Sequence, residues 1–293
     1  MFLMYSCKEC NSNKVLTLKT YKRKWFICED CGSGYPMQRE CYPLQFIPCS
    51  TFKKKDINAS QMYDYFIEQE HIKCSQNEVK LFQEKYVNSG LLDVHNKKIL
   101  DISGGNGVFL SELVKMGSDG VLTEFNEKSV EFARANLNLK AVKYDLNQDN
   151  LENLVDEKFD FIFLRACLMF CEDLPRLLSS LSLLLQPGGK VFIQYAVYPT
   201  LGTLIRTQLD EFSYARLRSP QIIRENFIRA GFKEEYFEDE IDPTLYVYDH
   251  DKSNSWLFLH YLYEIPGVLK TRKNHAAALR ARTRNRANFI FRL

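Results

Sequence analysis

The chain has 293 residues, of which 45% are hydrophobic and 26% are charged, a composition ordinary for a globular protein with a sizeable core. Its formal net charge of +2 comes from 39 basic and 37 acidic residues, so overall charge gives no argument for a nucleic acid or a membrane as partner. Polar residues interrupt every apolar run, which excludes a predicted membrane-spanning helix, and the N-terminus has no signal-peptide pattern. We therefore expect a cytoplasmic protein with reduced thiols.

The N-terminal segment 1–50 holds six of the nine cysteines. Cys7 and Cys10 form one C-x-x-C pair, and Cys28 and Cys31 form a second pair after 17 intervening residues. Two such pairs are typical of a zinc ribbon, in which each knuckle directs two thiolates at one tetrahedral Zn²⁺. The sequence therefore predicts a zinc-ribbon module over these residues.

The predicted zinc is structural, because four thiolates leave no coordination position for water or substrate. Between the two pairs, Val15–Leu18 and Trp25–Ile27 are expected to form a hairpin. The alternative is a set of four unligated, buried cysteines. Cys41 and Cys49 have no matching partners, so we expect buried thiols there and leave their role open.

Residues 51–97 are expected to form a helical linker or lid, with apolar residues such as Val79, Phe82 and Tyr86 at three- and four-residue steps. From Lys98 onward, short apolar runs alternate with helical patterns, which predicts a parallel sheet with helices on both faces. The predicted strands are 99–102, 121–123, 141–144, 159–164, 190–194, 236–240 and 256–263. A helix is predicted from Ser219-Pro220 to Gly231.

The most informative stretch is the strand 99–102, which runs into the turn Ser103–Gly107. A second strand follows the next helical pattern and ends on Glu124. A strand, a turn with little side-chain bulk, a helix and an acid after the next strand make up half of a nucleotide-binding unit. The glycines let the backbone approach a ligand, and a carboxylate accepts hydrogen bonds from both ribose hydroxyls. The glycine spacing differs from the G-x-G-x-x-G dinucleotide pattern.

The order acid-x-small-x-Gly-x-Gly over 101–107 resembles motif I of the class I S-adenosylmethionine (SAM) methyltransferases, with Ser103 in place of the family's first glycine. Further matches follow in the family's order, at Glu124, Asp145, the strand 159–164 and the turn 185–189. The resemblance covers residues 98–235. It implies an α/β fold with a doubly wound, seven-stranded class I methyltransferase sheet behind the small zinc ribbon.

The resemblance also implies a cofactor site. Asp101 would orient the amino end of the methionine moiety, and Ser103, Gly105 and Gly107 would allow the close backbone approach. Glu124 would bind the ribose hydroxyls.

Three further segments complete this implied site. Phe125 would face the adenine, and Asp145, with Leu146 beside it, would meet the adenine amino group; the alternative for Asp145 is a solvated loop aspartate. Arg165, at the end of the fourth strand, would lie beside the methyl donor. The sequence identifies no catalytic base, since Leu168–Phe170 stands where many relatives carry a histidine.

Several basic residues raise the possibility of an anionic partner. Arg206, Arg216 and Arg218 either hold an anionic acceptor or lie on a solvated helix face. Eight Lys or Arg residues follow Glu264 with no acid among them, so the rest of the chain is net acidic. This basic end and Lys22–Lys24 would form a phosphate-binding surface if the acceptor were RNA.

The predicted organisation is a zinc-ribbon module (1–50), a helical linker or lid (51–97), a SAM-binding methyltransferase domain (98–265) and a basic C-terminal tail (266–293). The predicted function is methyl transfer from SAM to a small-molecule or sugar-like acceptor, with a structural zinc. One alternative is an RNA methyltransferase that uses the basic tail and the ribbon. The other is a catalytically silent SAM-binding or interaction module.

Overall fold

The computed structural model of the chain describes residues 6–7, 9–19, 24–31, 33–37, 69–153, 155–195, 218–240 and 286–293. A small antiparallel sheet contains β1 (Val15–Lys19), β2 (Lys24–Cys28) and β3 (Gly34–Met37). The strands of a large sheet are β4 (Lys98–Ile102), β5 (Asp119–Glu124), β6 (Lys140–Lys143), β7 (Phe159–Arg165), β8 (Leu185–Tyr195), β9 (Lys233–Glu240) and β10 (Arg286–Arg292). The helical elements are α3 (Gln69–Phe82), the π-helical turn η2 (Gln83–Val87), α4 (Val108–Lys115), α5 (Glu127–Leu137), the 3-10 turns η3 (Leu151–Asn153) and η4 (Leu168–Phe170), α6 (Leu174–Leu184) and α8 (Pro220–Arg229).

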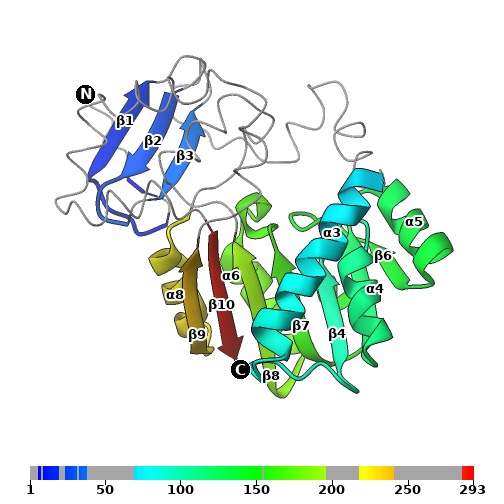
Figure 1. Cartoon of the computed structure of the whole chain (residues 1–293). Coiled ribbons are helices and arrows are strands. Elements are labelled where there is room, and N and C mark those ends of the chain that lie inside the picture. Colours follow the sequence, from blue (N-terminus) through cyan, green and yellow to red (C-terminus); the bar gives the residue numbers. More distant parts are fainter. Residues whose placement is uncertain are drawn as a thin grey trace.

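The large sheet has the strand order β6-β5-β4-β7-β8-β10-β9 (Figure 1). The first five of these strands are parallel, and β10 runs antiparallel to both of its neighbours. This arrangement confirms the predicted α/β fold with a seven-stranded methyltransferase sheet. The β1–β2 pair confirms the predicted hairpin, and β3 adds a strand that the sequence pattern did not predict.

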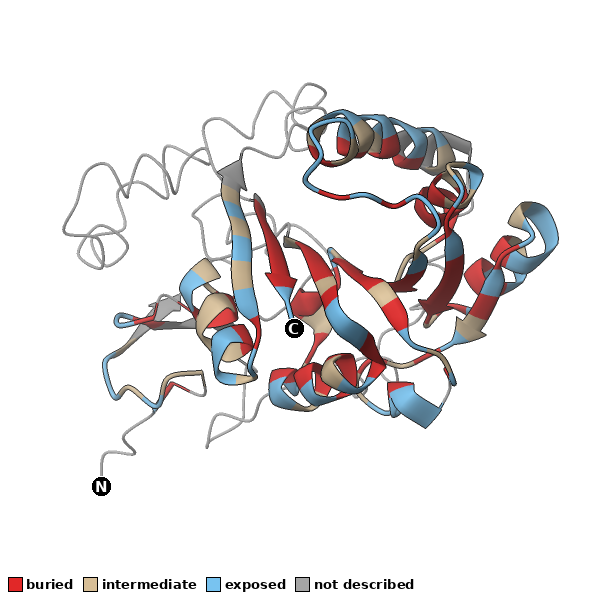
Figure 2. Cartoon of the chain, turned by 90° about the horizontal axis from the view of Figure 1, so that it is seen from below, coloured by how far each residue is buried: buried red, intermediate tan, exposed pale blue. Residues whose placement is uncertain are grey.

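Helices cover both faces of the sheet. Successive residues of a strand point to opposite faces, so each strand contributes side chains to two apolar clusters, one on each face. In β4, Leu100 and Ile102 pack with α6 and α8, whereas Ile99 packs with α3, α4 and α5. Figure 2 shows the strands largely buried and the outer sides of the helices exposed. Burial on both faces explains the nearly continuous apolar runs of β4 and β7.

Aromatic rings fix α3 against the sheet. The Phe82 ring lies 5.0 Å from the Phe109 ring and 5.2 Å from the Phe192 ring, measured between centroids. Val79, Phe82 and Tyr86 are all buried, which confirms the helical periodicity. The N-terminal part of the predicted linker, 51–68, lies outside the described residues.

Two predictions for the second half of the sheet need correction. The fifth strand begins earlier than predicted, at Leu185, so the predicted turn falls within β8. There the pairing with β7 is interrupted: Phe159 pairs with Leu185 but Phe161 pairs with Lys190, which leaves residues 186–189 opposite the single residue Asp160. Gly188, at φ 77°, supplies left-handed backbone in this interruption. The end of the predicted basic tail forms β10 inside the sheet, where it pairs with β8 and β9 and buries Ala287, Phe289, Ile290 and Phe291.

The other C-terminal predictions are partly testable. The strand 236–240 is confirmed within β9, and the helix at Ser219 is confirmed as α8, whose Ser219 side chain caps Ile222 N. The strand predicted at 256–263 lies outside the described residues, as do residues 266–285 of the predicted tail. Among the residues that the structure describes, no helix combines the length and apolarity that crossing a membrane requires.

Candidate functional site

The turn after β4 is shaped by its backbone. Ser103, Gly105 and Gly107 adopt left-handed φ angles of 55°, 64° and 77°. A side chain at Gly104 would place its Cβ 2.5 Å from both Asp101 Oδ2 and Leu122 Cδ1. Ser103 therefore occupies a conformation that glycine adopts more easily, which agrees with the glycine of the family pattern. The turn lies directly on the carboxylate of Asp101.

Asp101 is a buried carboxylate whose hydrogen-bonding capacity is not used by the described residues. Its side chain is 0% exposed, and neither of its oxygens has a hydrogen-bond partner among those residues. Burial raises the pKa of Asp101 from 3.8 to about 6, against the opposing effect of the Arg165 charge. Burying an unpaired polar group is unfavourable, so this carboxylate is suited to receive a ligand that donates hydrogen bonds.

Glu124, at the end of β5, is fixed against the same turn. Its Oε2 accepts a hydrogen bond from Gly105 N at 3.0 Å. Its Oε1 accepts from Phe125 N at 2.8 Å and from Asn126 N at 3.0 Å. The backbone of the two loops thus orients a carboxylate that is only 5% exposed, 23 positions along the chain from Asp101.

The loop after β6 carries Asp145 and Leu146. Asp145 is partly buried, and its Oδ1 accepts a hydrogen bond from Asn147 N at 3.0 Å. The Asn147 side chain then joins this loop to the loop after β7: its Nδ2 donates to Phe170 O at 2.9 Å, and its Oδ1 accepts from Glu172 N at 2.9 Å. The predicted adenine-side residues are therefore held next to η4.

Arg165 connects three elements. Its guanidinium carbon lies 3.5 Å from the Phe109 ring centroid, and its Nη2 pairs with Glu78 Oε2 at 2.6 Å. The side chain is 13% exposed and its charge acts on Asp101. Arg165 thus places a positive charge at the end of β7 while joining it to α3 and α4. No local sequence pattern indicates Glu78, because only the fold brings α3 to this strand.

The four cysteines of the predicted zinc site come together. Cys7 Sγ lies 3.6 Å from Cys31 Sγ, Cys10 Sγ lies 3.6 Å from Cys28 Sγ, and all four sulfurs lie within 4.8 Å of one another. Zinc–sulfur bonds of about 2.3 Å in a tetrahedron place sulfurs about 3.8 Å apart, so the cluster has suitable dimensions for Zn²⁺. Asn11 adopts the left-handed φ of 58° that the first knuckle needs.

The structure contradicts both roles that the sequence suggested for Arg218, a solvated helix-face residue and a binding group for an anionic acceptor. The side chain is 1% exposed, so it does not lie on a solvated helix face. Its guanidinium contacts Glu9 of the first knuckle and the backbone carbonyls of Leu168 and Cys171. These contacts make it an internal connection between the cysteine cluster and η4, not an exposed binding group for an acceptor. Arg206, Arg216, Cys41, Cys49, Lys22 and Arg23 lie outside the described residues.

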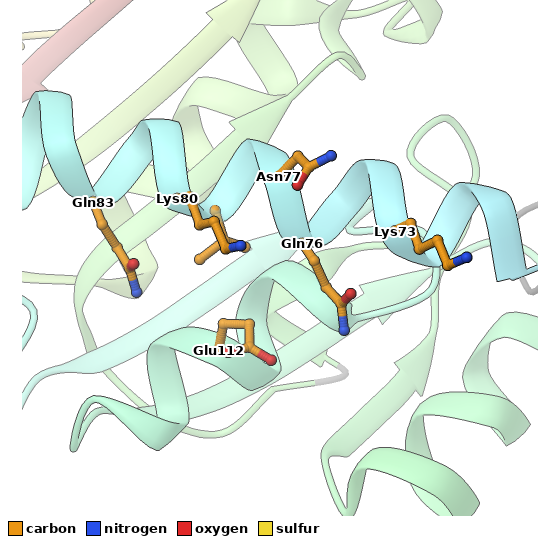
Figure 3. Close-up of a pocket in the computed structure, with 7 residues that line it drawn as sticks. Lys73, Gln76, Asn77, Lys80, Gln83 and Glu112 are labelled. Carbon is orange, nitrogen blue, oxygen red and sulfur yellow. The ribbon is translucent and has the colours of Figure 1, made fainter.

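A hollow of about 490 Å³ lies between α3 and α4, away from these groups (Figure 3). Gln76 and Lys80 of α3 and Gln83 of η2 extend toward Glu112 of α4 (Figure 3). Its lining is mainly polar and contains none of the predicted cofactor or metal residues. The candidate site is therefore the edge formed by β4, β5, β6 and β7, and this hollow is a separate surface feature.

The family described as "Methyltransferase domain" matches residues 67–239, more than half of the chain. The chain belongs to this family, and its sheet is that of a class I SAM-dependent methyltransferase. The match begins at the start of α3 and ends in β9.

Curated relatives are similar over shorter stretches. The biotin biosynthesis bifunctional protein BioHC of Cellvibrio japonicus is 28% identical over 138 residues, which are 44% of this chain and 27% of that protein. The ubiquinone/menaquinone biosynthesis C-methyltransferase UbiE of Shewanella sp. is 26% identical over 167 residues, 47% of this chain and 66% of the relative. The chain thus spans less than two thirds of the length of either relative.

Solved structures share the fold. A SAM-dependent methyltransferase from Mesorhizobium loti matches with a TM-score of 0.52 at 17% identity, covering 72% of this chain and 97% of that one. A putative sarcosine dimethylglycine methyltransferase from Galdieria sulphuraria matches with a TM-score of 0.50 at 16% identity, covering 74% and 85%. Both agree with the seven-stranded architecture.

Proposed function

We propose that the protein transfers the methyl group of SAM to a small-molecule acceptor. The observation that carries this proposal is Asp101, a buried carboxylate without a hydrogen-bond partner among the described residues, at the turn that follows β4. The ammonium group of a methionine moiety has both the charge and the donors to satisfy it. Glu124, fixed 23 positions away on the neighbouring strand, has the chemistry to bind a ribose.

The remaining cofactor roles follow from the same edge. The left-handed turn at Ser103, Gly105 and Gly107 would allow the backbone to approach the ligand. Asp145 and Leu146, held beside η4, would meet the adenine together with Phe125. Arg165, at the end of β7, would lie on the methyl-donor side.

The chemistry that SAM supplies when bound is an activated methyl group on a sulfonium. The protein then needs mainly to orient an acceptor nucleophile in line with that group and to exclude water. Asp101 and Glu124 would fix the two ends of the cofactor against the turn. A base is optional for such a transfer, and we assign none.

The relatives support a small-molecule acceptor. The names of the first two refer to biosynthesis of biotin and of ubiquinone or menaquinone, and a third, from Sinorhizobium medicae, is named a ubiquinone biosynthesis O-methyltransferase and is 22% identical over 54% of this chain. The sequence features behind the RNA alternative, Lys22, Arg23 and the basic segment 270–285, lie outside the described residues.

We also propose that Cys7, Cys10, Cys28 and Cys31 bind one structural zinc. The sulfur spacing supports this, since all four sulfurs lie within 4.8 Å of one another, as does the burial of Cys7, Cys28 and Cys31. Zn²⁺ would hold these sulfurs as thiolates. Reduced thiols at such a site fit a cytoplasmic location.

The test is a methyl-transfer assay with the zinc-loaded full chain and methyl-labelled SAM. Extract is separated beforehand into RNA and small-molecule fractions, and Asp101→Asn serves as the inactive control. We expect label in small molecules with the wild type only. Label in the RNA fraction would contradict the acceptor class, and no label above the control in either fraction would contradict the activity.

A further inference from the structure

Arg218 lies between two regions that are far apart in the sequence. Its Nε is 3.3 Å from Glu9 Oε1, and Glu9 stands between the first two cysteines of the cluster. On the other side, Nη1 donates to Leu168 O at 2.9 Å and Nη2 donates to Cys171 O at 2.8 Å. Arg218 is 1% exposed and Glu9 is 9% exposed, so water screens this ion pair very little.

The two carbonyls that Arg218 holds flank η4, and η4 borders the predicted adenine loop. Asn147 donates to Phe170 O and accepts from Glu172 N, so the position of η4 and that of the loop after β6 depend on each other. An ion pair from Glu9 to Arg218, followed by hydrogen bonds at η4, therefore connects the first cysteine knuckle with the residues expected around the adenine.

A second contact joins the same regions through packing. Ile222, in the first turn of α8, is 2% exposed and packs with the buried cysteines Cys7, Cys28 and Cys31. Ser219 caps this helix directly after Arg218. The start of α8 thus touches the cysteine cluster with an apolar side chain while Arg218 touches η4.

We propose that Arg218 is a positioning residue that couples zinc binding at the cysteine cluster to cofactor binding at the sheet. This proposal rests on the function proposed above. The zinc-bound knuckle fixes Glu9, Glu9 fixes the guanidinium, and the guanidinium fixes the carbonyls at both ends of η4. When the knuckle loses its metal, Glu9 is no longer held, and the buried charge of Arg218 lacks its counter-ion.

Coupling of this kind is reciprocal for equilibrium binding. Zinc should raise the affinity of the full chain for S-adenosylhomocysteine about tenfold, and saturating S-adenosylhomocysteine should raise zinc affinity by the same factor. Both affinities are measured, the first by calorimetry with and without zinc and the second by competition with a metal-binding dye. The variant that tests the coupling is Glu9→Gln, which keeps the shape of the side chain and removes its charge.

The matched control is Glu234→Gln, because Glu234 pairs with Arg224 of the same helix α8 at 2.6 Å without touching the cysteine cluster or η4. We expect the tenfold coupling in the wild type and in the control, and about twofold or less in Glu9→Gln. Arg218→Lys keeps one charge but not the fork that holds two carbonyls, so it should also lose most of the coupling.

Hydrogen exchange provides a readout that is independent of the cofactor. Phe170 N and Cys171 N donate within η4, to Cys167 O and Leu168 O. Zinc removal should increase the exchange rates of these two amides in the wild type. In Arg218→Lys the two amides should exchange fast even with zinc bound, so zinc removal should not increase their rates further. Wild type that binds no S-adenosylhomocysteine in either metal state contradicts the proposed function, while this exchange experiment still tests the coupling.

The coupling is overturned by any of three results. These are equal coupling in Glu9→Gln and Glu234→Gln, exchange at Phe170 and Cys171 that ignores the metal, and a wild-type chain that takes up no zinc.

Discussion

Two regions of the molecule bury polar groups: the proposed cofactor edge, formed by the ends of β4, β5, β6 and β7, and the cysteine cluster. The two regions hold their polar groups in place in different ways. At the cofactor edge, Asp101, the following turn and Glu124 lie within 24 consecutive residues, and backbone conformation and backbone hydrogen bonds place them. At the cysteine cluster, the contacts with the sheet come from Glu9, Arg218 and η4, and side chains make them.

This difference predicts how each region responds to substitution. A site encoded by backbone shape tolerates few residues at the turn, because left-handed φ angles and close approach restrict the choice. A junction made by buried side chains depends instead on every partner being present, since one missing partner leaves a buried charge or carbonyl unsatisfied.

The largest effect is expected at the cysteine cluster, with Cys28→Ser. If four thiolates share the roughly 10–16 kcal/mol of structural zinc binding equally, losing one removes about 2.5–4 kcal/mol. Zinc content of the purified protein should fall from one equivalent to a small fraction. The control is Cys167→Ala, a buried cysteine outside the cluster, which should keep its zinc. Full zinc content in Cys28→Ser would show that the cluster is not the metal site.

At the cofactor edge, Asp101→Asn should change how stability depends on pH. The pKa of Asp101 is about 6 in the folded protein, against 3.8 for an exposed aspartate. The bound proton therefore favours the folded state of the wild type: this contribution to stability is fully present below pH 3.8 and is lost as the pH rises from 3.8 through 6. The variant lacks this loss. Its free energy of unfolding relative to wild type should rise by about 2.4 kcal/mol between pH 4 and pH 7.

Denaturant unfolding of ligand-free protein at several pH values measures this difference, with Asp119→Asn, an exposed acid at the start of β5, as control. A constant difference between Asp101→Asn and wild type across this range would mean that Asp101 ionises normally in the fold.

Gly104→Ala tests the close contact between the turn and Asp101. The new Cβ would lie 2.5 Å from Asp101 Oδ2 and from Leu122 Cδ1, so we expect a loss of about 2 kcal/mol in stability together with weaker S-adenosylhomocysteine binding. Gly90→Ala is the control: its φ is 78° and nothing lies within 4 Å of its Cβ, so it should lose about 1 kcal/mol without affecting binding. If Gly104→Ala and Gly90→Ala bound S-adenosylhomocysteine equally well, Asp101 and the turn beside it would not contribute to ligand binding.

The smallest effect is expected for Ser103→Gly. Glycine relieves the left-handed φ of 55° but increases the freedom of the unfolded chain, so the net change should lie within about 1 kcal/mol. Asn96→Gly, at a φ of 55° away from the site, should change stability by a similar amount. Thermal unfolding measures both. A loss of S-adenosylhomocysteine affinity greater than about tenfold would show that the Ser103 hydroxyl itself contacts the ligand.

The cofactor edge could be predicted from the sequence because its signals are local. The apolar strand before Asp101, the glycines after it and the acid ending the next strand stand in chain order, and the sheet then confirms that β4 and β5 are neighbours. The four cysteines were predictable for the same reason, since each pair is local and the chemistry of one metal joins them.

The rest depends on contacts between distant residues. From the sequence, Arg218 was expected either to hold an anionic acceptor or to lie on a solvated helix face. Nothing near it in the sequence indicates that Glu9 and the carbonyls of η4 surround it. β10 was hidden because its short apolar run stands between arginines at the end of a basic segment, and only its pairing with β8 and β9 shows that it is a strand. The partner of Arg165 on α3, Glu78, has no sequence signal either.

The central claim is that the edge of β4 and β5 binds SAM through Asp101 and Glu124. The most direct test is calorimetric titration of the zinc-loaded wild type and of Glu124→Ala with S-adenosylhomocysteine, with Glu131→Ala, an exposed acid of α5, as control. We predict one site of micromolar affinity in the wild type and the control, and a loss of at least about 100-fold in Glu124→Ala. No binding by the wild type, or equal binding by Glu124→Ala, would contradict the account.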